Sequence, residues 1–366
     1  MKIGILTHYN VNNQGAQLQL YALSSYLKEL GHDVYVLTYT KNFDYSADAA
    51  KRNNVSIRSL PFYIKEYLFK RGFGLSLFNA RKYRKLMRFL NSSNELRPYD
   101  KFPTDAVVIG SDEVFSLDVG MNKMMYGIGL MSDYAICYAP SFGRTSIEDV
   151  ERRGCREEIS AGLRSIYRLS ARDAHTKELV ELLSGREAPL VCDPVLLYIF
   201  KGERAKIKPI KHKYLLLYAY DRNMCGQSEI DAIQAYARKH GLITVSAGTY
   251  HKWCDRNVCC NALEWVEYIR GAECVVTDTF HGTVVAMKTH RDVAVFIRKS
   301  INVFKLKSLL ADTAAEDREM MGVTYDELER VFSASMDYGI IDAHIANIAQ
   351  RSAAYLREAL EGVNGE

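Results

Sequence analysis

Short apolar runs, each followed by a polar turn and a segment with helical spacing, recur along the chain. Residues 2–7 and 33–39 are runs typical of strands. Between them, residues 16–30 carry apolar side chains at 18, 20, 23, 27 and 30, and Gly31 follows where a helix is expected to end. Parallel strands joined by a helix characterise α/β folds, so the chain is predicted to begin with a strand–helix–strand unit.

The same pattern continues to the C-terminus and divides the chain in two. Residues 166–183 predict a short strand, a polar turn and a helix. Other strands are predicted at 104–115, 133–143, 213–220, 242–248, 274–277 and 291–297, and other helices at 227–240, 261–272 and over most of the C-terminal region. Asp193-Pro194 marks the predicted boundary, because the residue before a proline is biased away from helix. We therefore predict two domains, 1–193 and 194–366, that face each other across a cleft.

Residues 41–103 interrupt the first half with a basic, aromatic-rich segment, which we interpret as a helical insertion. Within it, 81–90 has the pattern of an amphipathic helix with a cationic face. The favoured interpretation is a solvated helix that packs its Tyr and Leu side chains inward. The alternative is contact with an anionic or lipid-linked partner, which would put the protein at a membrane surface.

Composition limits the classes of function. The 366 residues suit two domains, and a net charge of +4 favours anionic ligands over a protein that coats nucleic acid, so no nucleic-acid partner is expected. No apolar run is long enough to span a membrane, and the N-terminal run lacks the pattern of a signal peptide, so we expect a cytoplasmic protein. The eight cysteines form no CxxC pair. The nearest metal-ligand set is His251, Cys254 and Cys259, but reduced thiols without a metal are the favoured interpretation.

Two loops of the first half carry candidate ligand contacts where a predicted strand ends. The loop before the first helix contains Asn12, Gln14 and Gly15 and lacks the GxGxxG of a dinucleotide site. Amides both donate and accept hydrogen bonds, so they suit a hydroxyl-rich ligand, although the loop could instead satisfy its own backbone. In the second loop, Ser111 and Asp112 follow Gly110, and Asp112 is either a base, a hydroxyl-orienting acceptor or a helix N-cap.

A cation follows a predicted strand further along the first half. Arg172 lies in the turn 169–176, and its planar guanidinium suits a carboxylate or a phosphate. Because Asp173 is adjacent, an ordinary ion pair between the two is an equal alternative.

The stretch "CVVTDTFHG" (274–282) joins a strand to a helix and carries further candidates. The strand leads to Asp278, and the helix begins near His281, Gly282 and Thr283. Free N–H groups and the helix dipole make such a helix start an anion site, and a histidine there is a candidate general acid. The alternative is a structural histidine bonded to Asp278. Arg298 and Lys299 follow the next strand on the same side of the sheet and are candidates for holding a phosphate.

Several segments together resemble the polysaccharide pyruvyl transferase family. In family order they are 10–23, "VVIGSDEVF" (107–115), "YAPSFG" (138–143), 169–185, "VCDPVLL" (191–197) and 275–288. The resemblance implies a GT-B-like fold of two Rossmann-type domains with doubly wound parallel sheets around a cleft. It also implies transfer of pyruvate from phosphoenolpyruvate to hydroxyls of a saccharide, as a ketal.

The resemblance also implies roles for individual residues. By this resemblance, Arg172 would hold the anionic groups of the donor and His281 would be the general acid/base. Arg298 or Lys299 is a loosely matched further cation. Some members carry arginine where this sequence has Thr279, so donor binding is expected to depend on these cations and on backbone amides.

The chemistry then needs one group to give a proton and another to take one. Asp112 or Asp278 would orient or deprotonate the acceptor hydroxyl, and phosphoenolpyruvate is a co-substrate, so no cofactor or metal is expected. The expected acceptor is a saccharide precursor of the cell surface, with a lipid-linked form as one alternative. The competing functions are a GT-B glycosyltransferase that uses a nucleotide sugar and a non-catalytic saccharide-binding protein.

Overall fold

The first half of the chain forms a parallel sheet in the order β3-β2-β1-β4-β5. A computed structural model describes residues 1–40, 73–119, 121–200, 204–298 and 303–364. The five strands are β1 (Lys2–Leu6), β2 (Asp33–Thr38), β3 (Glu95–Pro98), β4 (Ala106–Ile109) and β5 (Ala135–Cys137). All are short, and β4 and, apart from Lys2, β1 are apolar and buried as expected for strands covered on both faces, whereas the edge strand β3 is polar.

The second half forms a separate parallel sheet with the order β11-β10-β9-β6-β7-β8. Its strands are β6 (Tyr214–Tyr218), β7 (Ile243–Ala247), β8 (Arg256–Val258), β9 (Cys274–Thr277), β10 (Asp292–Phe296) and β11 (Glu319–Met320). In both sheets the strand order reverses beside the first strand, between β1 and β4 and between β6 and β9. Ligands of doubly wound folds bind at such points, outside the carboxyl ends of the strands.

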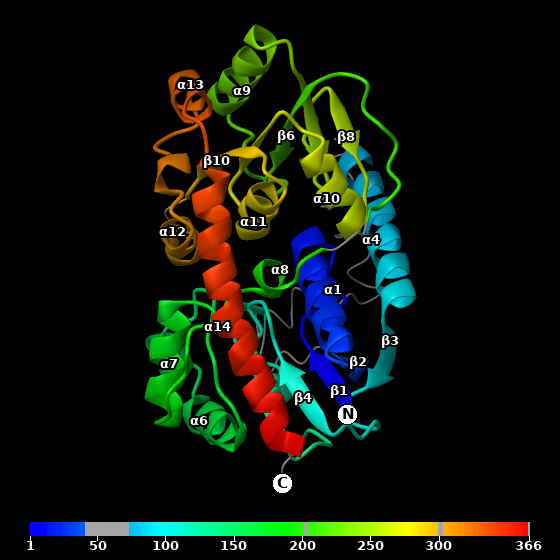
Figure 1. Cartoon of the computed structure of the whole chain (residues 1–366), viewed down its shortest axis with the longest axis vertical. Coiled ribbons are helices and arrows are strands. Elements are labelled where there is room, and N and C mark those ends of the chain that lie inside the picture. The colour runs from blue at the N-terminus through cyan, green and yellow to red at the C-terminus, as the bar shows by residue number, and fades with distance from the viewer. Residues whose placement is uncertain (41–72, 120, 201–203, 299–302, 365–366) are drawn as a thin grey trace.

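Helices cover both sheets and fill the space between them (Figure 1). In the first half they are α1 (Gln14–Glu29), α4 (Phe73–Ser93), α5 (Ile147–Arg152), α6 (Arg156–Ser165), α7 (Ala174–Ser184) and α8 (Pro194–Leu197). The second half adds α9 (Gln227–Lys239), α10 (Ala262–Arg270), α11 (Phe280–Lys288), α12 (Val303–Asp312), α13 (Tyr325–Ser333) and α14 (Tyr338–Asn364). Short 3-10 helices lie at Leu117–Val119, Lys123–Tyr126 and Glu316–Arg318.

One apolar core joins the two halves. It includes Leu23 of α1, Trp265 of α10, Val284 of α11 and Leu356 of α14, each fully buried. Two smaller cores lie on the outer sides, one in each half. Burial of the shared core holds the halves together, so the loops at the facing strand ends keep a defined geometry.

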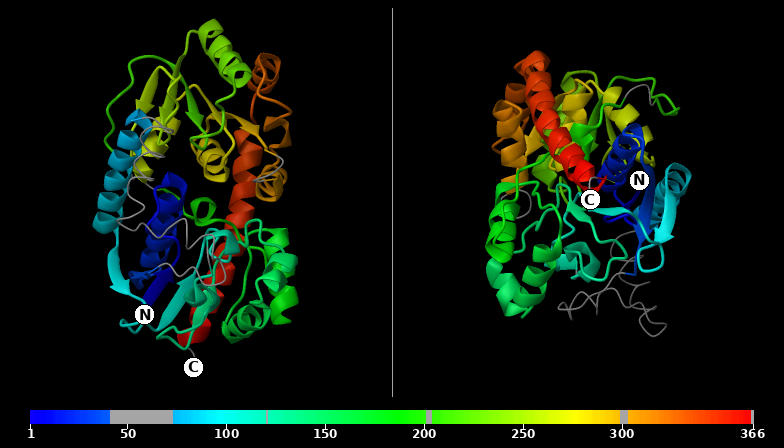
Figure 2. Two further views of the ribbon diagram at one scale, coloured as in Figure 1. Left: turned by 180° about the vertical axis from the view of Figure 1, so that it is seen from behind. Right: turned by 60° about the horizontal axis from the view of Figure 1, so that its bottom comes forward.

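The last helix, α14, lies against both halves. Figures 1 and 2 show it running from the second sheet back to the first. The Tyr355 hydroxyl donates to the Cys137 carbonyl at 2.8 Å, and the Ser352 Oγ accepts from the Cys192 amide at 2.9 Å. The boundary at 193/194 stays a prediction, and the end of the terminal helix packs on the half that precedes that boundary.

The predicted basic segment is described only from residue 73 onward, and residues 41–72 lie outside the described part. The predicted amphipathic helix 81–90 lies within α4, where Leu86, Phe89 and Leu90 are buried and Arg84 and Arg88 are exposed. The strand β3 was not predicted, because its sequence "ELRP" is polar and has no strand pattern. No helix among the described residues is long and apolar enough to cross a membrane.

Candidate functional site

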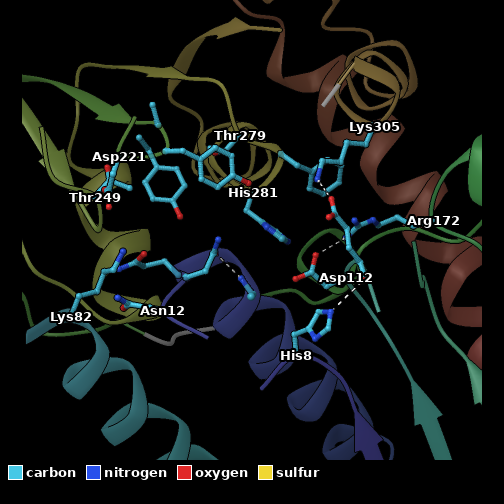
Figure 3. Close-up of a pocket in the computed structure, with 18 residues that line it drawn as sticks. His8, Asn12, Lys82, Asp112, Arg172, Asp221, Thr249, Thr279, His281 and Lys305 are labelled. Carbon is cyan, nitrogen blue, oxygen red and sulfur yellow. Dashed lines mark hydrogen bonds and ion pairs between the residues drawn. The ribbon is translucent and has the colours of Figure 1, made fainter. Parts of the chain in front are cut away.

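A cavity of about 330 Å³ lies where the strand ends of the two sheets face each other (Figure 3). Residues following β1 and β4 come from the first sheet, and residues following β6, β7 and β9 come from the second. Its lining consists mainly of polar side chains: His8, Asn12, Asn13, Gln14, Ala16, Lys82, Asp112, Glu113, Arg172, Tyr218, Ala219, Tyr220, Asp221, Thr249, Thr279, Phe280, His281 and Lys305. The cavity therefore brings together five of the predicted site residues: Asn12, Gln14, Asp112, Arg172 and His281.

His281 reaches the cavity from the first turn of α11. Thr279 caps this helix, and its Oγ1 accepts from the Gly282 amide at 3.1 Å. The histidine Nε2 lies 3.3 Å from Asp193 Oδ2. The suggested structural bond with Asp278 is therefore wrong: the partner of His281 comes from the first half of the chain.

Asp193 connects the catalytic candidates to each other. Its side chain is fully buried, and its Oδ2 also accepts from Arg172 Nη1 at 3.2 Å and from Ser111 Oγ at 3.4 Å. Its other oxygen caps α8 by accepting from the Val195 amide at 3.0 Å. Burial alone would raise the pKa of the Asp193 carboxyl, but His281, Arg172 and the cap bond outweigh burial and lower it to about 2. The carboxylate is therefore ionised at neutral pH.

The helix α8 is also fixed at its other end. Lys288, at the end of α11, donates to the carbonyls of Val195 at 2.7 Å, Leu196 at 3.3 Å and Tyr198 at 2.6 Å. These are carbonyls that a short helix leaves without partners. The helices α8 and α11 are therefore joined twice, by Asp193 with His281 at the start of α8 and by Lys288 with the carbonyls at its end. These two contacts fix the position of His281.

Arg172 is a buried cation of the cavity. Its side chain is 3% exposed and pairs with Asp193 at 3.2 Å and Asp112 at 3.7 Å, and its guanidinium lies 5.4 Å from the centre of the Phe280 ring. The suggested pairing with the adjacent Asp173 is wrong, since Asp173 caps α7 and bonds Ser141. Arg172 Nε and Nη2 are buried without a hydrogen-bond partner in the described part of the chain. Such a guanidinium can hold two anionic oxygens of a ligand.

Asp112 follows β4 with φ of 78°, a left-handed conformation that aspartate tolerates better than most residues. It does not cap a helix, so that alternative is wrong. Burial raises the pKa of its carboxyl, but Arg172, followed by His281, His8 and Lys305, lowers it below the ordinary value. A carboxylate with a low pKa is a weak base, so Asp112 is suited to accept a hydrogen bond from a ligand and poorly suited to remove its proton.

The loop before α1 also meets His281. A Cβ at Gly15 would overlap the His281 ring, so only glycine allows this approach. Gln14 Nε2 donates to the Cys260 carbonyl at 3.2 Å, and Asn12 Nδ2 donates to the Asn79 carbonyl at 3.2 Å. Their amide oxygens are buried without a partner among the described residues. The loop thus joins the two halves and borders the cavity.

Six further candidates lie outside the cavity lining or outside the description. Ser111, Gly282 and Thr283 are buried behind it: Ser111 bonds Asp193, and the Thr283 hydroxyl donates to the Thr279 carbonyl at 3.0 Å. Asp278 accepts from Arg298 Nε at 3.1 Å and from Asn223 at 2.5 Å. Arg298 also pairs with Glu229 at 3.0 Å, which turns this cation toward structural partners. Lys299 lies outside the described residues.

Four functional candidates were missed from the sequence. His8 directly follows the predicted strand 2–7, and a polar residue at the carboxyl end of a predicted parallel strand was a signal that could have found it. Its ring bonds the Tyr39 hydroxyl at 3.2 Å and the Glu113 carbonyl at 3.1 Å. Asp193 was interpreted only as a domain boundary. Lys305 and Lys82 lie on α12 and α4, where nothing in the local sequence distinguishes them from surface lysines. Lys305 pairs with Glu113 at 2.7 Å.

A metal site is not evident in the described part of the chain, where no group of three or more His, Cys, Asp or Glu side chains has suitable geometry. In the suggested set, the His251 ring instead bonds Ser246 at 3.2 Å and the Asn223 carbonyl at 3.1 Å. Cys254 is buried, and burial raises the pKa of its thiol well above the ordinary value. These residues belong to the packing of the second half.

A model of the polysaccharide pyruvyl transferase family matches residues 13–300. No curated protein sequence matches the chain. Among solved structures, a putative UDP-N-acetylglucosamine 2-epimerase from Listeria monocytogenes is 10% identical, with a TM-score of 0.54 over 99% of this chain and 97% of its own. The glycosyltransferase SnogD from Streptomyces nogalater is 14% identical, with a TM-score of 0.47 over 100% and 99%. The two facing parallel sheets and the first of these likenesses confirm the predicted GT-B-like fold.

Proposed function

Because the chain belongs to the polysaccharide pyruvyl transferase family, we propose that it transfers pyruvate from phosphoenolpyruvate to hydroxyls of a saccharide. The observation that carries this proposal is the meeting of His281, Arg172 and Lys305 in one cavity between the two sheets. A donor with a carboxylate and a phosphate needs two fixed positive charges, and Arg172 and Lys305 supply them.

In the proposed reaction, a proton from His281 adds to the methylene carbon of phosphoenolpyruvate. The neighbouring carbon becomes oxocarbenium-like, and an acceptor hydroxyl oxygen forms a bond to it. The hydroxyl proton then returns to His281, and the bond between that carbon and the phosphate oxygen breaks. Loss of phosphate leaves that carbon oxocarbenium-like again, a second hydroxyl oxygen of the acceptor bonds to it, its proton goes to the departing phosphate, and a cyclic ketal results. The products are the pyruvate ketal and inorganic phosphate.

The surrounding residues divide these tasks according to their charges. Asp112 and Asp193 both have lowered pKa values, so near neutral pH they are ionised and poor at exchanging protons. Asp112 orients the acceptor hydroxyl, and Asp193 orients the imidazole of His281. The histidine is then the group that both gives and takes the proton.

The test is release of phosphate from phosphoenolpyruvate, screened with lipid-linked and nucleotide-linked saccharides. Wild-type protein should release phosphate only when a suitable acceptor is present, and His281→Ala should reduce the rate by at least 10²-fold, on the order expected for loss of a general acid. Isothermal titration provides the decisive comparison. Saturable binding of a nucleotide sugar, with no binding of phosphoenolpyruvate, would support a glycosyltransferase instead.

A further inference from the structure

Lys82 occupies an unusual position on α4. The buried side chains of this helix are Phe78, Lys82, Leu86, Phe89 and Leu90, so Lys82 takes a place in an otherwise apolar stripe. It is only 5% exposed, whereas the basic residues Arg81, Arg84 and Arg88 on the same helix face solvent. A lysine is rarely this buried unless it is paired.

Among the residues that the structure describes, the ammonium group of Lys82 has no partner. Within the described ranges, no hydrogen bond or ion pair holds it, although its side chain lines the cavity. Asp221 is the carboxylate whose charge acts on Lys82, but it accepts hydrogen bonds from Asn79 Nδ2 at 3.2 Å and from the Tyr250 amide at 3.2 Å. By contrast, Lys85, one turn further along, pairs with Glu264 at 2.9 Å.

Burial without a contact partner is unfavourable for a cation. Desolvation lowers the pKa of Lys82, and the charge of Asp221 only partly offsets this. An ammonium group held in this way is stabilised by an anion that comes within contact distance.

The location of Lys82 shows which part of a substrate it would meet. In Figure 3, Lys82 lies with Asn12, Thr249 and Asp221 on one side of His281, and the pair Arg172 and Lys305 lies on the other. The second pair is the one assigned above to the donor. Around Lys82 the other groups are amide, hydroxyl and carboxylate, which are suited to the hydroxyls of a saccharide.

We propose that Lys82 binds an anionic group, a phosphate or a carboxylate, carried by the saccharide acceptor. This inference rests on the proposed function for the division between donor and acceptor. It places the acceptor with its reacting hydroxyl near His281 and its anionic group on the α4 side of the cavity. Neutral saccharides lack that contact and bind less tightly.

Calorimetric titration tests the proposal without phosphoenolpyruvate. Each of the sugars glucose, galactose and mannose is used as its 1-phosphate, as the methyl glycoside of its uronic acid and as its neutral methyl glycoside. Wild-type protein should bind at least one phosphate or uronate at least tenfold more tightly than its neutral counterpart, and which of the two binds identifies the anion. Lys82→Gln should abolish the preference, and Lys82→Arg should keep most of it.

Two matched variants complete the design. Lys85→Gln, on the same helix, should keep the preference, and thermal unfolding of Lys82→Gln should show an intact fold. The proposal is overturned if no probe shows a charge preference, if Lys82→Gln retains it, or if Lys305→Gln removes it while Lys82→Gln does not. A preference that depends on Lys82, in a protein that releases no phosphate from phosphoenolpyruvate, would overturn the proposed reaction and leave the anion site standing.

Discussion

Replacing Asp193 by Asn tests the buried charge network that holds His281. Asparagine keeps nearly the same shape and can still cap α8 through the Val195 amide, so the substitution removes mainly the negative charge. In the wild type this charge faces Arg172 Nη1 at 3.2 Å and His281 Nε2 at 3.3 Å, in a side chain with no exposed surface. The variant leaves the 3% exposed Arg172 with Asp112, at 3.7 Å, as its remaining ion-pair partner.

The magnitude follows from the lowered pKa of Asp193. The folded value of about 2 lies below the ordinary value of 3.8, and at ~1.36 kcal/mol per pKa unit the difference corresponds to about 2–3 kcal/mol. Because the pKa is lower in the folded state, this stabilisation is present above pH 4 and is lost as the pH falls through 2. At pH 3 about half of it should remain.

Urea unfolding of wild type and Asp193→Asn measures this directly. At pH 7 the variant should lose about 2–3 kcal/mol of unfolding free energy, and the difference between the two proteins should shrink by about half at pH 3. A difference below about 0.5 kcal/mol at pH 7, or one independent of pH, would refute the account of a charge-stabilised network. Phosphate release should fall by about 10²-fold or more, since the imidazole loses its orienting carboxylate. Asp173→Asn is the matched control, because that buried cap carboxylate bonds Ser141 and the Thr176 amide but not His281, so its turnover should stay near wild type.

Three other substitutions separate positioning from binding. Gly15→Ala should reduce turnover by about 10²-fold, because the added Cβ displaces the His281 ring. The control Gly322→Ala should leave turnover unchanged, because the nearest atom to its Cβ would lie 3.8 Å away. Equal activity in the two variants would contradict the close approach of Gly15 to His281. Lys288→Met should lower the unfolding free energy by about 2–4 kcal/mol, because three carbonyls at α8 lose an ammonium donor, and a loss below about 0.5 kcal/mol would show that water replaces it. Arg298→Gln should lower the unfolding free energy by about 2 kcal/mol, because Asp278 loses its cation. The KM for phosphoenolpyruvate should stay within about twofold of the wild-type value. A tenfold rise in that KM would support the donor-binding role predicted for Arg298 from the sequence.

Local sequence patterns predicted most of the strands and helices and their order along the chain. Apolar runs predicted strands at 2–7, 213–220 and 274–277, which are confirmed to within a few residues as β1, β6 and β9. Local physics suffices there, because strand and helix signals depend on neighbours in the chain. The ends of these runs also identified the region of the site, because carboxyl ends of parallel strands lie at one edge of a sheet.

Which of the polar residues meet depends on how distant parts of the chain pack together. The tertiary structure placed Asp193, which the sequence marked as a boundary, against His281, and it paired Asp278 with Arg298 away from the cavity. It also turned Lys82 inward on a helix whose arginines, Arg81, Arg84 and Arg88, face solvent. The positions of Asp193 and Lys82 depend on the packing of α8 and α4 against the second half, and the pair of Asp278 and Arg298 forms where the adjacent strands β9 and β10 end. Hydrophobic periodicity reports which face of an element is buried, but not what it is buried against, so the sequence alone could not supply these partners.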